Sequence, residues 1–251
     1  MGKIIAVVNQ KGGVGKTTSA VNLTAALHDA GKRVLLCDFD PQANATSGLG
    51  LDKRKLRYSV YDVIINDVPA KDAIVHTNFG DVLPSTADLA GAGVELISMD
   101  TPNYRLRNAL ETVKDQYDLI FIDCPPSLEL LTINALAAAD SILVPVQCEY
   151  YALEGLSDLM STLRLIKQRI NPKLEIFGVA LTMFDGRTNF STQVAQEVRR
   201  HFPGKVYATV IPRNVRLAEA PSHGLPVTMY DKHSRGSIAY KAMAQEIIEK
   251  L

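Results

Sequence analysis

A glycine-rich loop between a predicted strand and a predicted helix constrains the fold of this chain more than any other feature. Residues 4–9 are apolar and rich in β-branched side chains, and residues 19–27 repeat apolar side chains at helical spacing. Between them, residues 11–18 read Lys-Gly-Gly-Val-Gly-Lys-Thr-Thr. A strand, a glycine loop ending in Lys-Thr and a helix, in this order, form a P-loop. The chain is therefore expected to begin with a strand–loop–helix unit that holds a polyphosphate.

Each residue of this loop has a predicted role. The glycines let backbone N–H groups close on phosphate oxygens, and the helix that opens near Lys16 directs its positive end at the same charge. Lys16 is expected to hold the β- and γ-phosphates, and the Thr17 hydroxyl to ligate Mg²⁺. Gln10 departs from the pattern, because it stands where the usual loop begins with glycine. The predicted nucleotide-binding residues are Lys11, Gly12, Gly13, Val14, Gly15, Lys16, Thr17 and Thr18.

Lys11 is a second lysine in a loop that already has one. We predict that it reaches a phosphate bound to a neighbouring subunit and acts in catalysis together with Lys16. A cation that completes a site in this way stabilises charge on the transferring phosphoryl group, as an arginine finger does, and is worth roughly 10³–10⁵ in rate in GTPases. A solvated surface lysine is the alternative interpretation.

Acidic residues follow two further predicted strands. Residues 33–38 form a buried strand, and residues 39–46 leave it as a polar turn. Because the ligand faces the carboxyl ends of strands in open α/β sheets, Asp38 and Asp40 should lie near the phosphates. We assign Asp40 to the attacking water and to the water shell of the metal, and Asp38 to an outer metal position or a structural role. A turn or helix-capping role is the alternative for either.

Residues 118–123 have the form of a Walker B strand, four apolar residues closed by an acid. Asp123 is expected to hold Mg²⁺ through water. The Cys-Pro-Pro-Ser sequence at 124–127 then predicts a rigid turn that could sense the γ-phosphate.

The remaining pattern alternates strands and helices. Further strands are predicted at 80–83, 141–146, 176–181 and 206–211, with helices between them such as 153–169. This alternation predicts an α/β P-loop NTPase fold, with a doubly wound, mostly parallel sheet and helices on both faces. No linker, low-complexity tract or repeat divides the 251 residues, so we expect a single domain over 1–251.

Charge and cysteine content narrow the class of protein. The net charge is zero, but residues 1–150 hold 13 basic and 18 acidic side chains, whereas residues 151–251 hold 14 and 9. The basic part could form an anion-binding face or an ordinary solvated surface. Cys37, Cys124 and Cys148 form no C-x-x-C pair and are expected to be buried, inert thiols. No signal-peptide pattern or membrane-length apolar run is present, so a cytoplasmic protein is expected.

With Lys11, the P-loop, the Asp40 turn and Asp123 in place, the chain resembles the ParA/Soj-type chromosome-partitioning ATPases. These belong to the deviant Walker A group, which includes MinD and the nitrogenase iron protein. The resemblance spans residues 1–251, and its family-typical strings lie at 9–18, 38–46, 123–127, 146–156 and 211–222. The last two strings are specific to the partitioning branch.

The resemblance implies an ATP-dependent homodimer in which each Lys11 reaches the partner's phosphates and Asp40 supports hydrolysis of ATP with Mg²⁺. It also implies that Pro212 and Asn214 lie near adenine. The ATP dimer would bind double-stranded DNA without sequence preference through Arg187 and Arg216. The implied partner is a ParB-type centromere-binding protein, and the implied role is chromosome or plasmid segregation on the nucleoid.

Three other functions would use parts of the same sequence. A MinD-like membrane switch would need a basic amphipathic C-terminal helix, but residues 237–251 carry only Lys241 and Lys250 as cations. We expect this segment to dock on the domain instead, through Ile238, Ala242, Ile247 and Leu251. A reductase like the nitrogenase iron protein would need two exposed cysteines at the dimer face. A regulator of another process, such as replication initiation, would use the same dimer and stays open.

Overall fold

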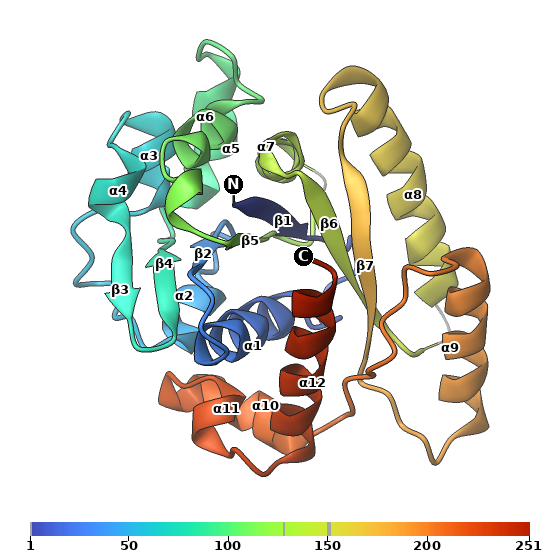
Figure 1. The fold of residues 1–251 in the computed structure, drawn as a ribbon. Helices are drawn as coiled ribbons and strands as arrows, with labels where there is room; N and C mark the ends of the chain where they lie inside the picture. Colours follow the sequence, from blue (N-terminus) through green and yellow to red (C-terminus); the bar gives the residue numbers. More distant parts are fainter. Residues whose placement is uncertain (1, 128, 150–151) are drawn as a thin grey trace.

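A seven-stranded sheet lies at the centre of the molecule (Figure 1). The computed structural model describes residues 2–127, 129–149 and 152–251, so part of the family-typical string at 146–156 lies outside the described residues. The strand order is β3-β4-β2-β5-β1-β6-β7, and the β3–β4 pair alone among these is antiparallel. The strands are β1 (Lys3–Val7), β2 (Val34–Asp38), β3 (Val75–Thr77), β4 (Gly80–Leu83), β5 (Leu119–Asp123), β6 (Ser141–Gln147) and β7 (Glu175–Thr182).

Helices cover both faces of this sheet, which confirms the predicted doubly wound α/β fold (Figure 1). One face carries α3 (Val60–Ile65), α4 (Ala70–Ala73), α5 (Leu89–Ile97), α6 (Arg105–Glu111), α7 (Leu130–Ala138), α8 (Ala152–Arg169) and α9 (Asn189–His201). The other carries α1 (Lys16–Asp29), α2 (Asn44–Gly48), α11 (Val227–Tyr230) and α12 (Arg235–Glu249). The short helices η1 (Lys114–Gln116), α10 (Val215–Glu219) and η2 (Ala220–His223) complete the described elements.

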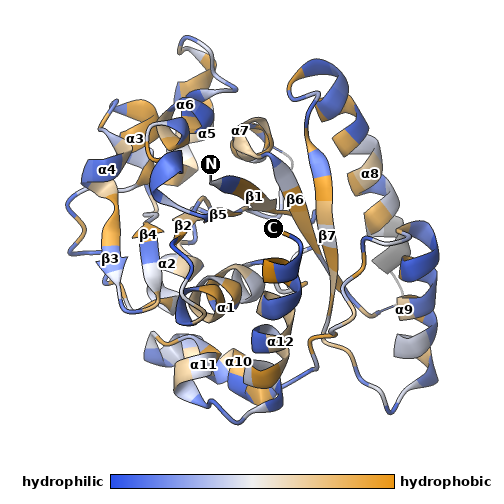
Figure 2. Ribbon diagram, in the orientation of Figure 1, coloured by the Kyte–Doolittle hydropathy of each residue, from blue (hydrophilic) through white to orange (hydrophobic). Residues whose placement is uncertain are grey.

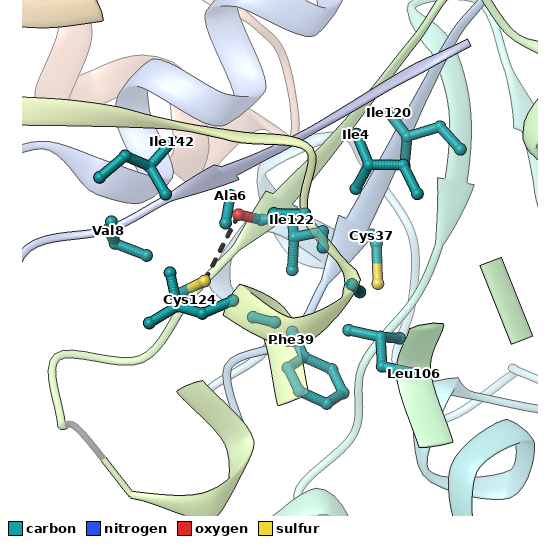
Figure 3. Close-up of a cluster of buried hydrophobic side chains, with 14 of the residues drawn as sticks. Ile4, Ala6, Val8, Cys37, Phe39, Leu106, Ile120, Ile122, Cys124 and Ile142 are labelled. Atoms are coloured by element: carbon teal, nitrogen blue, oxygen red, sulfur yellow. Dashed lines mark hydrogen bonds between the residues drawn. The ribbon is translucent and has the colours of Figure 1, made fainter. Parts of the chain in front are cut away.

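Two hydrophobic cores form because side chains alternate along each strand. On β1, Ile4 and Ala6 face one core, whereas Ile5 and Val7 face the other. Figure 3 shows the first core, where Ile4, Ile120 and Ile122 lie with the cysteines of β2 and the β5 end. Figure 2 shows the central strands as mostly hydrophobic and the outer helices as mixed. Strands buried on both faces read as continuous apolar runs, which is why the sequence pattern located them.

The predicted strand at 206–211 is wrong. The segment lies against β7 but makes only isolated bridges, at Val206 and Pro212. Its backbone N–H groups at Ala208 and Thr209 donate to the Glu246 carboxylate on α12, at 2.8 and 2.7 Å, and not to a neighbouring strand. A side chain therefore replaces part of the ladder that a strand would need.

The C-terminal helix docks on the domain, but through a different face from the one predicted. α12 contacts α1, and its buried apolar residues are Ala239, Tyr240, Met243, Ala244 and Ile247. The prediction was right for Ile247 and wrong for Ile238, Ala242 and Leu251, which are exposed. The buried positions recur every three or four residues and form an apolar stripe, but this stripe lies on a different side of the helix from most of the predicted residues.

The three cysteines are buried, as predicted. Burial raises the pKa of the Cys148 thiol to about 11 and the pKa values of Cys37 and Cys124 well above their usual range. These thiols are therefore protonated and unreactive at neutral pH. In the part of the chain that the structure describes, no helix combines the length and apolar character of a membrane span.

Candidate nucleotide site

Strand register brings the predicted site together at one edge of the sheet. β5 lies between β1 and β2, and Asp123 pairs in register with Val7 on one side and Asp38 on the other. The three strands therefore end at the same level. The P-loop that follows Val7 lies beside both carboxylates, as expected for the carboxyl edge of a parallel sheet.

The conformation of the P-loop is fixed by its own glycines and by hydrogen bonds of Asn9. Gly13 and Gly15 have φ values of 73° and 93°, a region that favours glycine, and Gly15 forms the N-cap of α1. The Asn9 side chain accepts from the Lys11 backbone N–H at 3.0 Å and donates to Pro145 at 2.7 Å. A Cβ at Gly12 or Gly13 would meet no described atom within 4 Å, so the space beside these two exposed glycines is open.

Lys16 lies at the centre of the site and is almost fully buried, with 7% of its surface exposed. Its Nζ donates to the Lys11 carbonyl oxygen at 3.2 Å. Burial lowers the pKa of Lys16, whereas the charges of Asp123 and Asp40 act in the opposite direction. The ammonium group rests on the loop's own backbone, from which it can transfer to a phosphate oxygen.

Asp123 is fully buried, and neither of its carboxylate oxygens accepts a hydrogen bond that satisfies ordinary geometry from a described residue. Burial, followed by the charge of Asp38, raises the pKa of Asp123 well above its usual range, while nearby Thr17 and Lys16 oppose the rise. Buried polar atoms normally have partners, so this carboxylate needs one. A hydrated Mg²⁺ fits, since its waters donate hydrogen bonds and its charge favours the ionised acid.

The described residues contain no group of three or more His, Cys, Asp or Glu side chains suited to hold a metal directly. Mg²⁺ does not require such a cage, because it commonly keeps several waters and binds one or two protein groups together with phosphate oxygens. The predicted set of Thr17, Asp40 and Asp123 therefore fits magnesium delivered with a nucleotide.

The two acids of the 39–46 turn have different environments. Asp38 is fully buried and accepts from the Thr46 backbone N–H and hydroxyl, both at 2.7 Å. Burial raises its pKa to about 6, although these hydrogen bonds oppose the shift. Asp40 is 8% exposed, and its Oδ1 accepts from the Gln42 N–H at 2.9 Å. Asp38 therefore fixes the turn, which favours its structural assignment, while Asp40 keeps one oxygen for other partners.

A cavity of about 200 Å³ adjoins the P-loop beside Gly15 and Thr18. Pro212 and Asn214, the residues predicted near adenine, line it. Thr182, Met183, Leu217 and Tyr240 line it as well and were not identified from the sequence. Met183 has a φ of 50°, which is uncommon for a residue other than glycine. No local motif marks Thr182, Met183 and Tyr240, whereas Leu217 lies in the family-typical string at 211–222. These segments meet only in the fold.

Lys11 lies at the rim of the site with 35% of its side chain exposed. Its Nζ is 4.0 Å from Oε2 of Glu149, which follows β6. Glu149 also accepts from Arg213 at 3.1 Å and from Gln147 at 2.5 Å. The sequence did not identify Glu149 as a site residue. The role of Lys11 across a dimer stays a prediction.

The two arginines predicted to bind DNA lie on separate segments, and each forms ion pairs within the chain. Arg187 donates twice to Asp185, at 2.9 and 2.7 Å, and this lowers the pKa of Asp185 to about 2. Arg216 pairs with Glu219 at 2.7 Å and with Asp231 at 3.4 Å. Their assignment to DNA stays a prediction.

The chain is similar to several known proteins. Residues 2–176 match a family described as an AAA domain. The sequence is 58% identical to the sporulation initiation inhibitor protein Soj of Bacillus subtilis, over 98% of each chain. It is 51% identical to the chromosome partitioning protein ParA of Caulobacter vibrioides, over 99% of this chain and 94% of that one. A solved structure from Mycobacterium smegmatis, described as cobyrinic acid a,c-diamide synthase with bound ADP and magnesium, has a TM-score of 0.86 at 38% identity and covers 99% of this chain and 95% of that one.

Proposed function

This chain belongs to the ParA/Soj family of chromosome-partitioning ATPases, and from that premise we propose that it is an ATP-driven dimerisation switch that acts on DNA. In its ATP form it binds double-stranded DNA without sequence preference and associates with the nucleoid. Hydrolysis to ADP and phosphate, stimulated by a ParB-type partner, returns it to a monomer. Cycles of this switch drive segregation of a chromosome or plasmid.

The observation that carries the nucleotide part of this proposal is the buried Asp123 carboxylate beside the P-loop: Thr17 lies near it, but none of the described residues gives it a hydrogen bond of ordinary geometry. Thr17 and Asp123, the latter through water, would hold Mg²⁺. When bound, the ion neutralises charge on the β- and γ-phosphates. Lys16 moves from the Lys11 carbonyl to these phosphates, and Asp40 orients the attacking water from its fixed turn.

The proposed dimer places Lys11 of each subunit on the phosphates of the other. The position of Lys11 at the rim, partly exposed and separate from the buried Lys16, supports this role. A cation supplied across the interface would stabilise the charge of the transition state only in the dimer. Hydrolysis is then coupled to assembly.

The DNA part of the proposal is supported by charge distribution. Residues 151–251 carry 14 basic and 9 acidic side chains, and dimerisation doubles this excess on one particle. Arg187 and Arg216 remain accessible, with 88% and 46% of their side chains exposed. Phosphates can therefore compete with their present acidic partners.

The test is retention of the Asp40→Ala protein on non-specific duplex DNA with ATP, with ADP and without nucleotide, over a salt titration. We expect binding that requires ATP, with a log–log salt slope of about −0.9 per phosphate contact. Lys16→Ala in the same background should abolish it. Equal binding in all three nucleotide states, or none in any, would contradict the proposal.

A further inference from the structure

We propose that Glu149 is a positioning residue for Lys11, which it holds within its own subunit until an ATP dimer forms. This inference rests on the proposed function, because it assumes that Lys11 acts across the dimer. The Glu149 carboxylate would compete with the phosphates of the partner subunit for Lys11, and this competition would help to set the ATP concentration at which the dimer forms.

Glu149 is built to face Lys11. Its Oε1 accepts from Gln147 at 2.5 Å and from Arg213 at 3.1 Å, which fixes the carboxylate on the rim. Its Oε2 is then presented to Lys11 Nζ, 4.0 Å away. Among the described residues, no other acidic side chain lies within 4.0 Å of this ammonium group. The carboxylate is therefore the electrostatic partner of Lys11 in the monomer.

The other end of Lys11 is also fixed. Its backbone N–H donates to Asn9 Oδ1 at 3.0 Å, and its carbonyl oxygen accepts from Lys16 Nζ at 3.2 Å. Only the flexible side chain remains free to choose between Glu149 and a phosphate of the partner subunit. A triphosphate carries more negative charge than one carboxylate, so the Lys11 ammonium group binds the phosphate in preference to Glu149 once the subunits are close.

Arg213 connects this contact to the nucleotide. It lines the 200 Å³ cavity next to Pro212 and Asn214, and its guanidinium holds Glu149. A base bound in the cavity would therefore lie beside Arg213, which donates to Glu149, and Glu149 in turn faces Lys11. Glu149 thus joins the base cavity to the lysine at the subunit edge.

The size of the effect follows from exposure and symmetry. The Lys11 and Glu149 side chains are 35% and 47% exposed, so the pair is screened and each release costs only about 1.5- to 5-fold in equilibrium. Forming one dimer releases two such pairs. Removing the carboxylate should therefore favour the dimer by about 2- to 30-fold.

The experiment compares dimerisation of Glu149→Gln with its parent, both in the Asp40→Ala background, by sedimentation at increasing ATP without DNA. Glutamine keeps the shape and an oxygen that Gln147 or Arg213 can donate to, while the charge is lost. We expect the Glu149→Gln dimer to be tighter by the factor above, and the advantage to shrink toward 1 M salt, where screening removes the pair. Glu149→Asp, which retains the charge, should behave more like the parent.

Glu197→Gln is the matched control, because Glu197 is also a partly exposed acid paired with a cation, Arg200, and does not contact Lys11. Its dimerisation should equal that of the parent. A Glu149→Gln protein that dimerises no more tightly than the parent, or whose advantage does not depend on salt, would overturn the inference. If the parent and the control also fail to dimerise with ATP, the proposed function is overturned as well. The two failures can be told apart, because loss of the proposed function affects every variant, whereas failure of the Glu149 inference concerns Glu149→Gln alone.

Discussion

Gly236 on α12 lets the C-terminal helix lie against the wall of the 200 Å³ cavity beside the P-loop. A Cβ added at Gly236 would be 2.7 Å from Leu217 Cγ and 3.0 and 3.1 Å from its two methyl carbons. Leu217 in turn lines the cavity beside Pro212 and Asn214. The substitution Gly236→Ala should therefore push Leu217 toward the space where a base would bind.

The magnitude follows from the distances. Carbon atoms in contact prefer about 3.5–4.0 Å, so Leu217 must move by roughly 0.8 Å or more. Overpacking of this kind costs about 1–3 kcal/mol. Alanine also gains about 0.5–1 kcal/mol over glycine in a helix. Gly93→Ala on α5 should give that gain alone, since a Cβ there would meet nothing within 4 Å.

The assay is thermal unfolding of both variants without nucleotide, followed by titration with ATP. Gly236→Ala should unfold about 2–12 °C below Gly93→Ala, given roughly 2–4 °C per kcal/mol for a chain of this size. If Leu217 relieves about 1–2 kcal/mol of the strain by moving into the cavity, ATP must displace it again to bind, and ATP affinity should fall about 5- to 30-fold. Equal melting temperatures and equal ATP affinities in the two variants would refute this account of the cavity wall.

Three further predictions concern charged groups. Burial raises the pKa of Asp38 to about 6 from its usual 3.8, so the folded state binds this proton more tightly than the unfolded state does. The free energy of unfolding of the nucleotide-free protein should therefore increase as the pH falls from 7.5 to 5, with about 1.4 kcal/mol of the increase coming from Asp38. In urea unfolding, Asp38→Asn should lack this contribution. The same pH dependence in the variant and the parent would contradict the prediction. Asp123→Asn should keep the fold but lose most of the extra thermal stabilisation that Mg²⁺ adds to bound ADP, and an unchanged magnesium titration would contradict the assignment. Asp185→Asn should release Arg187 and steepen the log–log salt slope of DNA binding by up to about 0.9 per subunit, whereas Asp52→Asn, which breaks a similar Asp-x-Arg pair, should not change it.

The parts of the site that could be predicted from sequence are those whose chemistry is local. The P-loop follows β1 and Asp123 ends β5, two strands that are buried on both faces, and their register places the loop and the carboxylate together once the strand order is known. Asp38 and Asp40 share a strand end, yet sequence left their roles open. The hydrogen bonds from Thr46 to Asp38 separate them.

The parts that could not be predicted depend on contacts between distant residues. Tyr240 lines the cavity beside the P-loop, and its hydroxyl lies 3.1 Å from that of Ser19, although 221 positions separate the two. The contact of Glu149 with Lys11 joins two family-typical strings, at 146–156 and 9–18, and neither string indicates that it meets the other. The false strand at 206–211 had suitable side chains, but α12 supplies the acceptor for its backbone.

That acceptor also determines how the edge of the sheet meets other molecules. An outer strand with free N–H groups is a template for pairing with another chain, and such pairing leads to aggregation. Here the segment after α9 lies along β7, and Glu246 accepts from two of its successive N–H groups. One carboxylate thus occupies two of the donors to which an incoming strand would bind at this edge. Two copies could pair edge to edge at these positions only after Glu246 had released both N–H groups.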